Sequence, residues 1–261
     1  MKMTSYRQGT PCWVDLSTTD EAGALEFYSG LFAWEDEPND AGDGATYHMQ
    51  KLGDAYAAAI TQQRPDEAAA GVPSHWATYL ATDDIDATAA RAGAAGGQLV
   101  AEPFDVMDAG RMAVVADPTG GLVSLWQAKQ HVGAGVIHEP GALTWSELIT
   151  DDPSAAAAFL EELLGIGVKG SPEAGGSTYL LLTVNGAPVA GVMEKTPEMG
   201  EIPSVWSTYF EVTDVEAALA RVESLGGRVV TSVMEEAHMR FAIAEDPQGA
   251  VFGLMTTKPR A

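Results

Sequence analysis

The chain has 261 residues, which is long enough for one or two domains with a sizeable buried core. With 46% hydrophobic and 20% charged residues, its composition is typical of a soluble globular protein and not of a disordered one. The 37 acidic and 14 basic residues give a net charge of −23, which disfavours DNA, RNA and anionic membranes as partners, because these require a basic surface. Such a charge favours cationic small molecules or basic partners, or it serves solubility alone.

The start of the chain and its cysteine content predict a cytoplasmic protein. The first residues, MKMTSYRQGTP, contain no apolar signal segment, and no uncharged apolar run approaches the roughly 18 residues of a membrane span. The single cysteine, Cys12, excludes an internal disulfide and a cysteine zinc cluster. It stands in a strand-like run, so we expect a packed thiol.

In chain order, the first predicted elements are a strand over TPCWVDLST (10–18) and a helix over DEAGALEFYSGLF (20–32). The capping-box pattern Thr18-x-x-Glu21 predicts where the helix begins. Apolar residues are spaced along one face of this helix. They are Leu25, Tyr28, Leu31 and Phe32.

Further strands and a second helix complete this first unit. Asp84 is placed to cap the helix, and Gly96-Gly97 to end it. The expected strands are ATYHMQKL (45–52), AYAAAI (55–60), HWATYLAT (75–82), QLVAEPF (98–104), RMAVVAD (111–117) and GLVSLWQ (121–127).

The sequence then repeats itself. At spacings of 129 to 132 residues, the matched pairs include Trp13 with Trp145, Tyr47 with Tyr179, PSHWATYL (73–80) with PSVWSTYF (203–210), and DPTG (117–120) with DPQG (246–249). The glycine-containing stretch AKQHVGAGVIHEPG (128–141) separates the copies. We therefore predict two tandem domains, residues 1–130 and 131–261.

Each copy is itself composed of two βαβββ modules, and the clearest helix is VEAALARVESL (215–225), which Asp214 opens. One module leaves a sheet face uncovered, so two modules are expected to pair into a curved mixed sheet round a cavity, with helices outside. The predicted fold class is α+β.

The segments 10–34, 73–97 and 111–126 resemble the vicinal oxygen chelate superfamily, which includes glyoxalases, bleomycin-resistance proteins and dioxygenases. They carry its order of strand, Asp and Phe-Tyr, then Tyr before Asp-Asp, then Asp-Pro-x-Gly before the last strand. Residues 142–255 match as well, so the resemblance covers essentially the whole chain. The chain is also similar to a tandem actinobacterial subgroup often named as hydroxylases or antibiotic-pathway proteins.

In metal-dependent members of the superfamily, the metal ligands lie on three strands, and the resemblance assigns them to positions of this chain. The matching residues are Trp13, Ala77 and Ser124 in the first copy, and Trp145, Ser207 and Gly253 in the second. None is an imidazole or carboxylate donor, so we expect no metal and no other cofactor. The departure argues against glyoxalase, extradiol dioxygenase and epimerase activity, and favours the metal-free binding members.

Strand periodicity predicts what lines the cavity instead. Aromatic residues and one carboxylate per copy share the former metal face. They are Trp13, Asp15, Tyr79, Ser124 and Trp126 in the first copy, and Trp145, Glu147, Ser207, Tyr209 and Met255 in the second. Such a surface suits a flat hydrophobic ligand with or without an amino group. Alternatively, the aromatic residues pack a closed core and the carboxylates cap backbone groups.

Further matched residues are candidates for the same cavity. Tyr47 and Tyr179 either line it or pack as strand tyrosines. Arg111 and Arg240 either pair with Asp15 and Glu147 across it or point to solvent. The histidines have no counterparts in the other copy, and only His238 is kept as a candidate base.

The leading hypothesis is a metal-free small-molecule-binding protein for sequestration, self-resistance or natural-product biosynthesis. The alternative is a cofactor-independent isomerase, cyclase or hydroxylase-like enzyme that uses Asp15, Glu147 or His238 for proton transfer. A third possibility is an interaction protein whose cavities have no function. We expect a monomer with an intrachain pseudo-dimer, or a weak homodimer, and no nucleic-acid or membrane partner.

Overall fold

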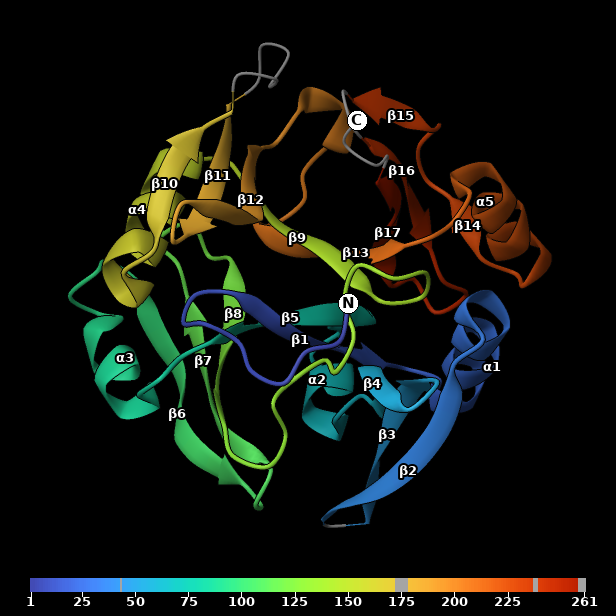
Figure 1. Cartoon of the computed structure of the whole chain (residues 1–261), viewed down its shortest axis with the longest axis horizontal. Helices are drawn as coiled ribbons and strands as arrows, with labels where there is room; N and C mark the ends of the chain where they lie inside the picture. The colour runs from blue at the N-terminus through green and yellow to red at the C-terminus, as the bar shows by residue number, and fades with distance from the viewer. Residues whose placement is uncertain (43, 172–177, 237–238, 258–261) are drawn as a thin grey trace.

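The computed structural model describes residues 1–42, 44–171, 178–236 and 239–257. The chain forms two curled sheets, one from each half of the sequence, with helices on their outer sides (Figure 1). The elements of the first half are β1 (Pro11–Thr18), α1 (Glu21–Phe32), β2 (Glu35–Gly42), β3 (Ala45–Leu52), β4 (Ala55–Gln62), α2 (Pro65–Ala69), β5 (His75–Ala81), α3 (Ile85–Arg91), β6 (Gln98–Val106), β7 (Gly110–Ala116) and β8 (Leu122–Ala128).

The second half repeats this series. Its elements are β9 (Leu143–Thr150), α4 (Pro153–Leu164), β10 (Gly167–Gly170), β11 (Tyr179–Val184), β12 (Ala187–Glu194), the short 3-10 helix η1 (Pro197–Met199), β13 (Val205–Glu211), α5 (Val215–Ser224), β14 (Arg228–Val229), β15 (Met234–Glu236), β16 (Met239–Glu245) and β17 (Val251–Thr257).

Each half is a pair of βαβββ modules joined side by side, which confirms the predicted α+β fold. The sheet orders are β2-β3-β4-β1-β5-β8-β7-β6 and β10-β11-β12-β9-β13-β17-β16-β14. The modules meet where β1 pairs antiparallel with β5, and β9 with β13. In this register Trp13 lies opposite Tyr79, and Trp145 opposite Tyr209, so the joint between modules brings the predicted site residues together.

Aspartates begin the four longer helices, but the expected cap of α1 was wrong by two residues. Asp20, and not Thr18, is the N-cap of α1, where its carboxylate accepts a hydrogen bond from Gly23 N at 3.1 Å. The predicted caps Asp84 and Asp214 are confirmed, and Asp152 caps α4 in the same way.

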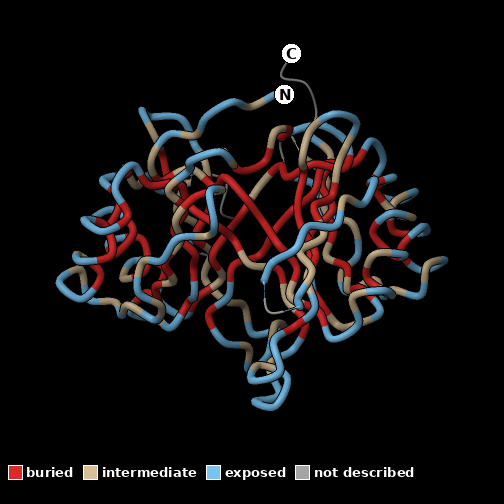
Figure 2. The backbone as a smooth tube through the Cα atoms, turned by 90° about the horizontal axis from the view of Figure 1, so that it is seen from below, coloured by how far each residue is buried: buried red, intermediate tan, exposed pale blue. Residues whose placement is uncertain are grey.

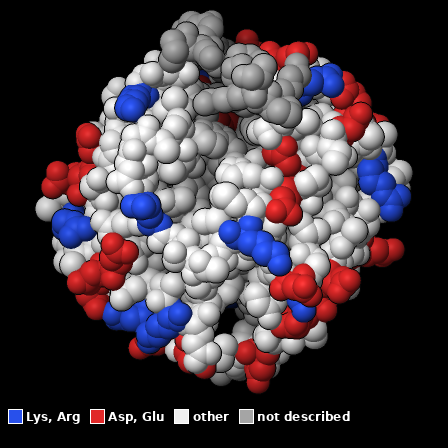
Figure 3. All heavy atoms as spheres, viewed as in Figure 1, with Lys and Arg blue, Asp and Glu red and all other residues white. Residues whose placement is uncertain are grey.

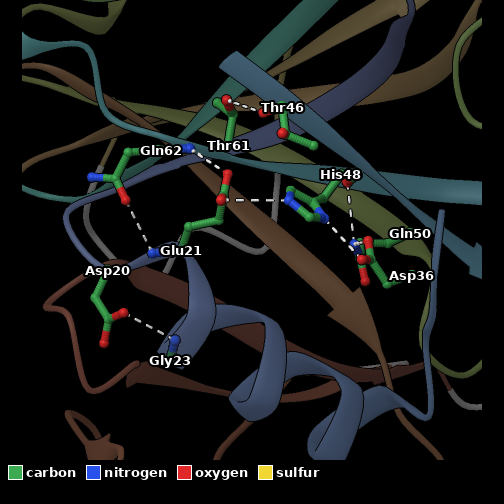
Figure 4. Close-up of polar contacts among 9 residues, drawn as sticks. All are labelled: Asp20, Glu21, Gly23, Asp36, Thr46, His48, Gln50, Thr61 and Gln62. Carbon is green, nitrogen blue, oxygen red and sulfur yellow. Dashed lines mark hydrogen bonds and ion pairs between the residues drawn. The ribbon is translucent and has the colours of Figure 1, made fainter. Parts of the chain in front are cut away.

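Because Thr18 does not cap α1, the Glu21 side chain forms no capping box and instead hydrogen-bonds to the sheet (Figure 4). It accepts a hydrogen bond from Gln62 N at 3.0 Å and lies 3.4 Å from His48 Nε2. The other ring nitrogen of His48 lies 2.8 Å from Asp36 of β2. Helix, edge strand and β3 are thus linked through one imidazole.

Strand β2 was not located from the sequence. Its segment, EDEPNDAG, is almost entirely exposed and has no apolar alternation, because it forms the outer edge of the first sheet. Acidic residues and proline at such an edge prevent pairing with other chains.

The two halves pack against each other through the faces that carry the helices, where β5 contacts β13. Buried residues are concentrated in the middle of the molecule and exposed ones at its periphery (Figure 2). Phe27 of α1 packs against Gly227, and its counterpart Phe159 of α4 packs against Gly97, so the contact has an approximate two-fold relation. Helices α1 and α5 lie side by side, as do α3 and α4 (Figure 1).

The two-fold relation is broken at one buried pair. The Tyr28 hydroxyl donates to Asp246 Oδ2 at 3.0 Å, and Trp76 Nε1 donates to the same hydroxyl at 3.0 Å. The counterpart of Tyr28 is Leu160, and Oδ2 of Asp117, the counterpart of Asp246, is buried without a hydrogen-bond partner in the described structure.

Cys12 is fully buried, as expected, and burial raises the pKa of its thiol. In the described part of the chain, no helix is both long and apolar enough to cross a bilayer. Acidic side chains are distributed around the visible face and do not form one patch (Figure 3).

Candidate functional site

The inner face of each curled sheet, turned away from the helices and from the other half, carries the predicted aromatic residues and carboxylate. In the first half β1 contributes Trp13 and Asp15, and β5 contributes Tyr79. All three are less than 10% exposed. The period of two along each strand and the β1–β5 register place them together.

A chain of hydrogen bonds connects these residues in the first half. Trp13 Nε1 donates to the Tyr47 hydroxyl at 2.9 Å, and that hydroxyl donates to Asp15 Oδ2 at 2.8 Å. The Tyr79 hydroxyl donates to the same oxygen at 2.7 Å. We call this set, and its counterpart in the second half, the Trp–Tyr–carboxylate–Tyr relay.

The second half forms the same relay with a longer acid. Trp145 Nε1 donates to the Tyr179 hydroxyl at 3.0 Å, and that hydroxyl donates to Glu147 Oε2 at 3.0 Å. The Tyr209 hydroxyl donates a short hydrogen bond to Oε1. Both glutamate oxygens are therefore held, whereas both tyrosines of the first half bind one oxygen of Asp15.

Burial dominates the electrostatics of the two relays. It raises the pKa of Asp15 and of Glu147, and the tyrosine hydrogen bonds act in the opposite direction on both. Burial and the adjacent carboxylate also raise the pKa of the relay tyrosines, which therefore remain neutral donors. Each carboxyl group is thus disposed to take up a proton or to attract a cation.

The walls beside the relays contain one aromatic residue and one methionine in each half, but in exchanged positions. Met112 of β7 pairs with Trp126 of β8 in the first half, whereas Phe241 of β16 pairs with Met255 of β17 in the second. Ring centres lie 6.4 Å apart for Tyr79 and Trp126. For Tyr209 and Phe241 the separation is 6.2 Å.

Sequence reasoning missed Met112 and Phe241. The repeat itself carried the signal, because they are matched positions next to the predicted strand pair. The predicted serines are buried beside the relay tyrosines and carboxylate: Ser124 pairs with Tyr79 across strands, and Ser207 pairs with Glu147.

The predicted pairing of Arg111 and Arg240 with Asp15 and Glu147 is wrong. Arg111 forms an ion pair with Asp86 of α3, where its Nη2 lies 3.1 Å from Oδ1. Arg240 binds Glu216 of α5 in the same way, with Nη1 and Oε2 3.0 Å apart. Both arginines fasten a helix to the outside of the sheet, since a residue at their position points away from the inner face. His238 lies outside the described residues.

The segment between the halves covers the first inner face. Its His131 ring stands edge-on to Trp13, with ring centres 4.5 Å apart, and lies 5.8 Å from Trp126. Trp126 Nε1 donates to the His131 carbonyl oxygen at 3.0 Å. Burial lowers the pKa of His131 to about 4, so the ring is neutral at neutral pH. His131 belongs to the stretch 128–141 between the copies and is one of the histidines without a counterpart, so the sequence did not indicate it as a site residue.

The positions that the superfamily resemblance assigns to metal ligands carry side chains that are poor donors. Indole, methyl and hydroxyl groups occupy them in the first half, at Trp13, Ala77 and Ser124, and none is a competent donor. The nearest carboxylate, Asp15, already accepts two tyrosine hydroxyls. Within the described ranges, no three His, Cys, Asp or Glu side chains form a group that could bind a metal ion.

Comparison with known sequences and structures identifies similar proteins. The sequence model of the Glyoxalase/Bleomycin resistance protein/Dioxygenase superfamily matches residues 12–125 and 142–254. The chain is 42% identical to CFP32 of Mycobacterium tuberculosis, whose name carries a provisional assignment as a glyoxylase, over 99% of both chains. It is 34% identical to the anthracycline biosynthesis protein DnrV of Streptomyces peucetius, over 97% of this chain and 95% of that protein.

Solved structures share the fold at low sequence identity. The Mn(II)-bound glyoxalase from Novosphingobium aromaticivorans superposes with a TM-score of 0.66 at 15% identity, covering 96% of this chain and 82% of the other. This likeness concerns the arrangement of the sheets alone.

Proposed function

The chain belongs to the glyoxalase/bleomycin resistance protein/dioxygenase superfamily, and we propose that it binds a flat aromatic small molecule, without a metal ion, as an accessory protein of secondary metabolism. One observation carries the proposal. Both halves have a buried Trp–Tyr–carboxylate–Tyr relay on the inner face of the sheet.

The relay fits recognition of an aromatic ligand. Trp13 and Trp145 offer flat apolar area whose orientation is fixed by the hydrogen bond from each indole. Burial raises the pKa of the carboxyl group beside each indole, because the tyrosine hydrogen bonds offset only part of the cost of burying its ionised form. An ammonium or amidinium group of a ligand would supply that compensation in a buried, hydrogen-bonded pair.

The relatives support this ligand class. Two proteins that are 34% identical to this chain over nearly its whole length, from Streptomyces sp. strain C5 and Streptomyces peucetius, are named for anthracycline biosynthesis. Anthracyclines combine a flat polycyclic quinone with an amino sugar, which corresponds to an aromatic wall next to a carboxylate. We therefore propose polycyclic aromatic natural products as the substrate class, with sequestration, self-resistance or a biosynthetic accessory role.

The raised pKa of Glu147 also supports a second candidate, a cofactor-independent enzyme. A carboxyl group with a pKa closer to neutrality is a competent general acid or base for an isomerase or cyclase. Asp15 would act in the same way in the first half. Glu147→Gln separates the candidates: carriage without chemistry leaves the bound ligand unchanged, whereas an enzyme converts it in the wild type and not in the variant.

Titration with 9-aminoacridine, a planar cation, tests the binding proposal. Tryptophan fluorescence should be quenched to saturation in protein freed of metal with a chelator, and added Mn²⁺ or Zn²⁺ should not change the affinity. Anthraquinone-2-sulfonate, a planar anion, should bind at least roughly ten times more weakly because of the carboxylate. Binding that requires added metal, or no quenching by either probe, would contradict the proposal.

We further propose that the chain acts as a cytoplasmic monomer. The two halves already bury an aromatic cluster that includes Phe27, Phe210 and Phe252. That internal contact takes the place of a homodimer contact. Sedimentation at micromolar concentration should give a mass of 27.3 kDa, and a mass twice as large would contradict the proposal.

A further inference from the structure

A slot opens in each half where the two central parallel strands diverge. In the first half β1 and β4 pair only from Asp15 and Ala59 onward, and the chain before that point is splayed. In the second half β9 and β12 pair only from Glu147 and Gly191 onward. The two slots are equivalent by the repeat, and each lies next to the relay tryptophan.

The linker between the halves fills the first slot; we call residues 131–135 the strap. Ala134 N donates to Cys12 O at 2.7 Å, and Gly135 N donates to Tyr56 O at 2.8 Å, so the strap is bonded to both edges of the slot. Gly133, at φ +109°, lies so close to the Cys12 carbonyl that a side chain would not fit. The Tyr6 hydroxyl holds the outer side of the strap through Ala134 O at 2.7 Å.

The strap places an aromatic ring on the relay tryptophan. The His131 imidazole stands perpendicular to Trp13, with ring centres 4.5 Å apart and an interplanar angle of 86°. Its Nε2 is buried without a hydrogen-bond partner in the described structure. Trp13 beneath it is only 3% exposed. A cavity of about 220 Å³ in this half borders Trp126, Tyr6 and Val132 of the strap, and no residue of the relay lines it.

A cavity of about 90 Å³ lies at the second slot, and the linker borders it through Ile137 and His138. Its lining includes Leu143, Trp145, Pro188 and Val189, the counterparts of Pro11, Trp13, Tyr56 and Ala57 at the filled slot. The other lining residues are Thr144 and Ser146 of β9, Thr10 and Pro11 of the first half, and Ile137 and His138 of the linker. Trp145 is partly exposed, and among the described residues no aromatic ring stacks on it. Among the described residues, the His131 ring therefore covers this fold position in the first half, whereas a cavity borders it in the second.

We infer that the second half is the ligand site, and that an aromatic ring of the ligand takes at Trp145 the place that the His131 ring takes at Trp13. The inference rests on the proposed function and names which of the two relays serves it. The internal occupant indicates the ligand chemistry: a flat ring, edge-on to the indole and carrying a polar ring atom.

The wall composition agrees with this assignment, and the cavity volume of about 90 Å³ sets how much of the ligand enters at Trp145. A cavity of roughly 150 Å³ holds a benzene molecule, so the hollow at Trp145 admits one ring edge and the rest of a polycyclic ligand extends along the inner face. There it would meet Phe241 and Met255, an aromatic ring and an adaptable thioether. Glu147 lies within the same relay and would pair with an amino group.

Calorimetric titration with 9-aminoacridine tests the inference through its stoichiometry. The wild type should bind one equivalent. Trp145→Leu should weaken this binding at least roughly tenfold, because it removes the stacking surface. His131→Gly, which removes the internal ring and leaves the strap backbone, should raise the stoichiometry to two, and 4-methylimidazole should compete only for the additional site. Circular dichroism and melting curves establish that each variant is folded.

The outcomes separate the inference from the proposed function. Two equivalents bound by the wild type, or full affinity in a folded Trp145→Leu variant, would overturn the inference and leave the proposed function standing. Glu147→Gln offers a second route if Trp145→Leu does not fold, and full affinity there would overturn it equally. No binding by the wild type or by His131→Gly would overturn the proposed function and the inference with it.

Discussion

The two inner faces of this protein share a hydrogen-bonded relay and differ in what covers it. In the first half, the Asp15 relay lies under a strap whose His131 ring packs on Trp13. In the second half, the Glu147 relay lies beside a hollow lined by Trp145. The two halves share the hydrogen-bonded residues of the inner face and differ in what packs against the relay tryptophan. The two copies thus keep one polar arrangement, and the linker packs a ring against the relay tryptophan of the first copy.

The largest predicted effect is on the free energy of unfolding when the packing of the strap in the first half is disrupted. Gly133→Ala should lower the free energy of unfolding by about 4 kcal/mol, because a methyl group there meets the Cys12 carbonyl and disfavours the positive φ. Gly120→Ala is the matched control, since Gly120 also has a positive φ but has open space around its Cα and should lose only about 1 kcal/mol. Urea unfolding of both variants measures the difference. Equal losses would show that the strap is not tightly packed.

The covered half should also respond to pH in a way that the other half does not. The folded-state pKa of His131, about 4, lies below its value of 6.5 in the unfolded chain. The unfolded chain therefore takes up a proton that the folded protein does not, so this stability is complete above pH 6.5 and is lost as pH falls towards 4, by at most about 3 kcal/mol.

The difference between wild type and His131→Phe isolates this contribution. The buried carboxyls Asp15 and Glu147 titrate in both proteins and cancel, and their raised pKa values act in the opposite direction, with stability lost as pH rises. Melting temperatures between pH 4 and 7.5 should fall more steeply in the wild type. Parallel curves would mean that His131 is not buried as a neutral ring.

Removing the carboxylate charge should weaken ligand binding when it is done in the second relay and not when it is done in the first. Glu147→Gln should weaken 9-aminoacridine binding by about 2 kcal/mol, or roughly thirtyfold, since a charge-assisted pair is lost while the tyrosine donors remain. Asp15→Asn is the matched variant and should leave the affinity within roughly twofold, because its face is covered. An equal loss in both variants would place ligand on both faces.

The smallest predicted effect tests the relation between the halves at their contact. Leu160→Tyr should place a hydroxyl near Asp117 Oδ2, which now lacks a partner, and so reproduce the bond from Tyr28 to Asp246. We expect about 1 kcal/mol of added stability from one buried hydrogen bond to a carboxylate. A lower melting temperature than the wild type would show that the two packing environments are not equivalent.

Much of this arrangement was predictable from the sequence, and the missing parts have a common cause. The strand period places Trp13 and Asp15 on one face, and the repeat pairs them with Trp145 and Glu147. Local pattern does not specify which side chain covers a face from elsewhere in the chain. For that reason His131, which reaches Trp13 from far along the sequence, was not predicted as part of the site.

The arginines show the same limit. Arg111 and Arg240 are matched in the repeat, which indicated a shared role, but nothing in their spacing distinguishes the inner face from the helix side. In the structure they bind Asp86 and Glu216. Strand β2 was missed for another reason, because an edge strand exposed on both sides needs no apolar alternation.

A crystal structure of the protein with 9-aminoacridine would show which of the two inner faces binds the ligand. We expect ordered ligand against Trp145 with its amino group near Glu147, and an unchanged first half with His131 on Trp13. Ligand bound under the strap against Asp15, or found only on the outer surface, would contradict it.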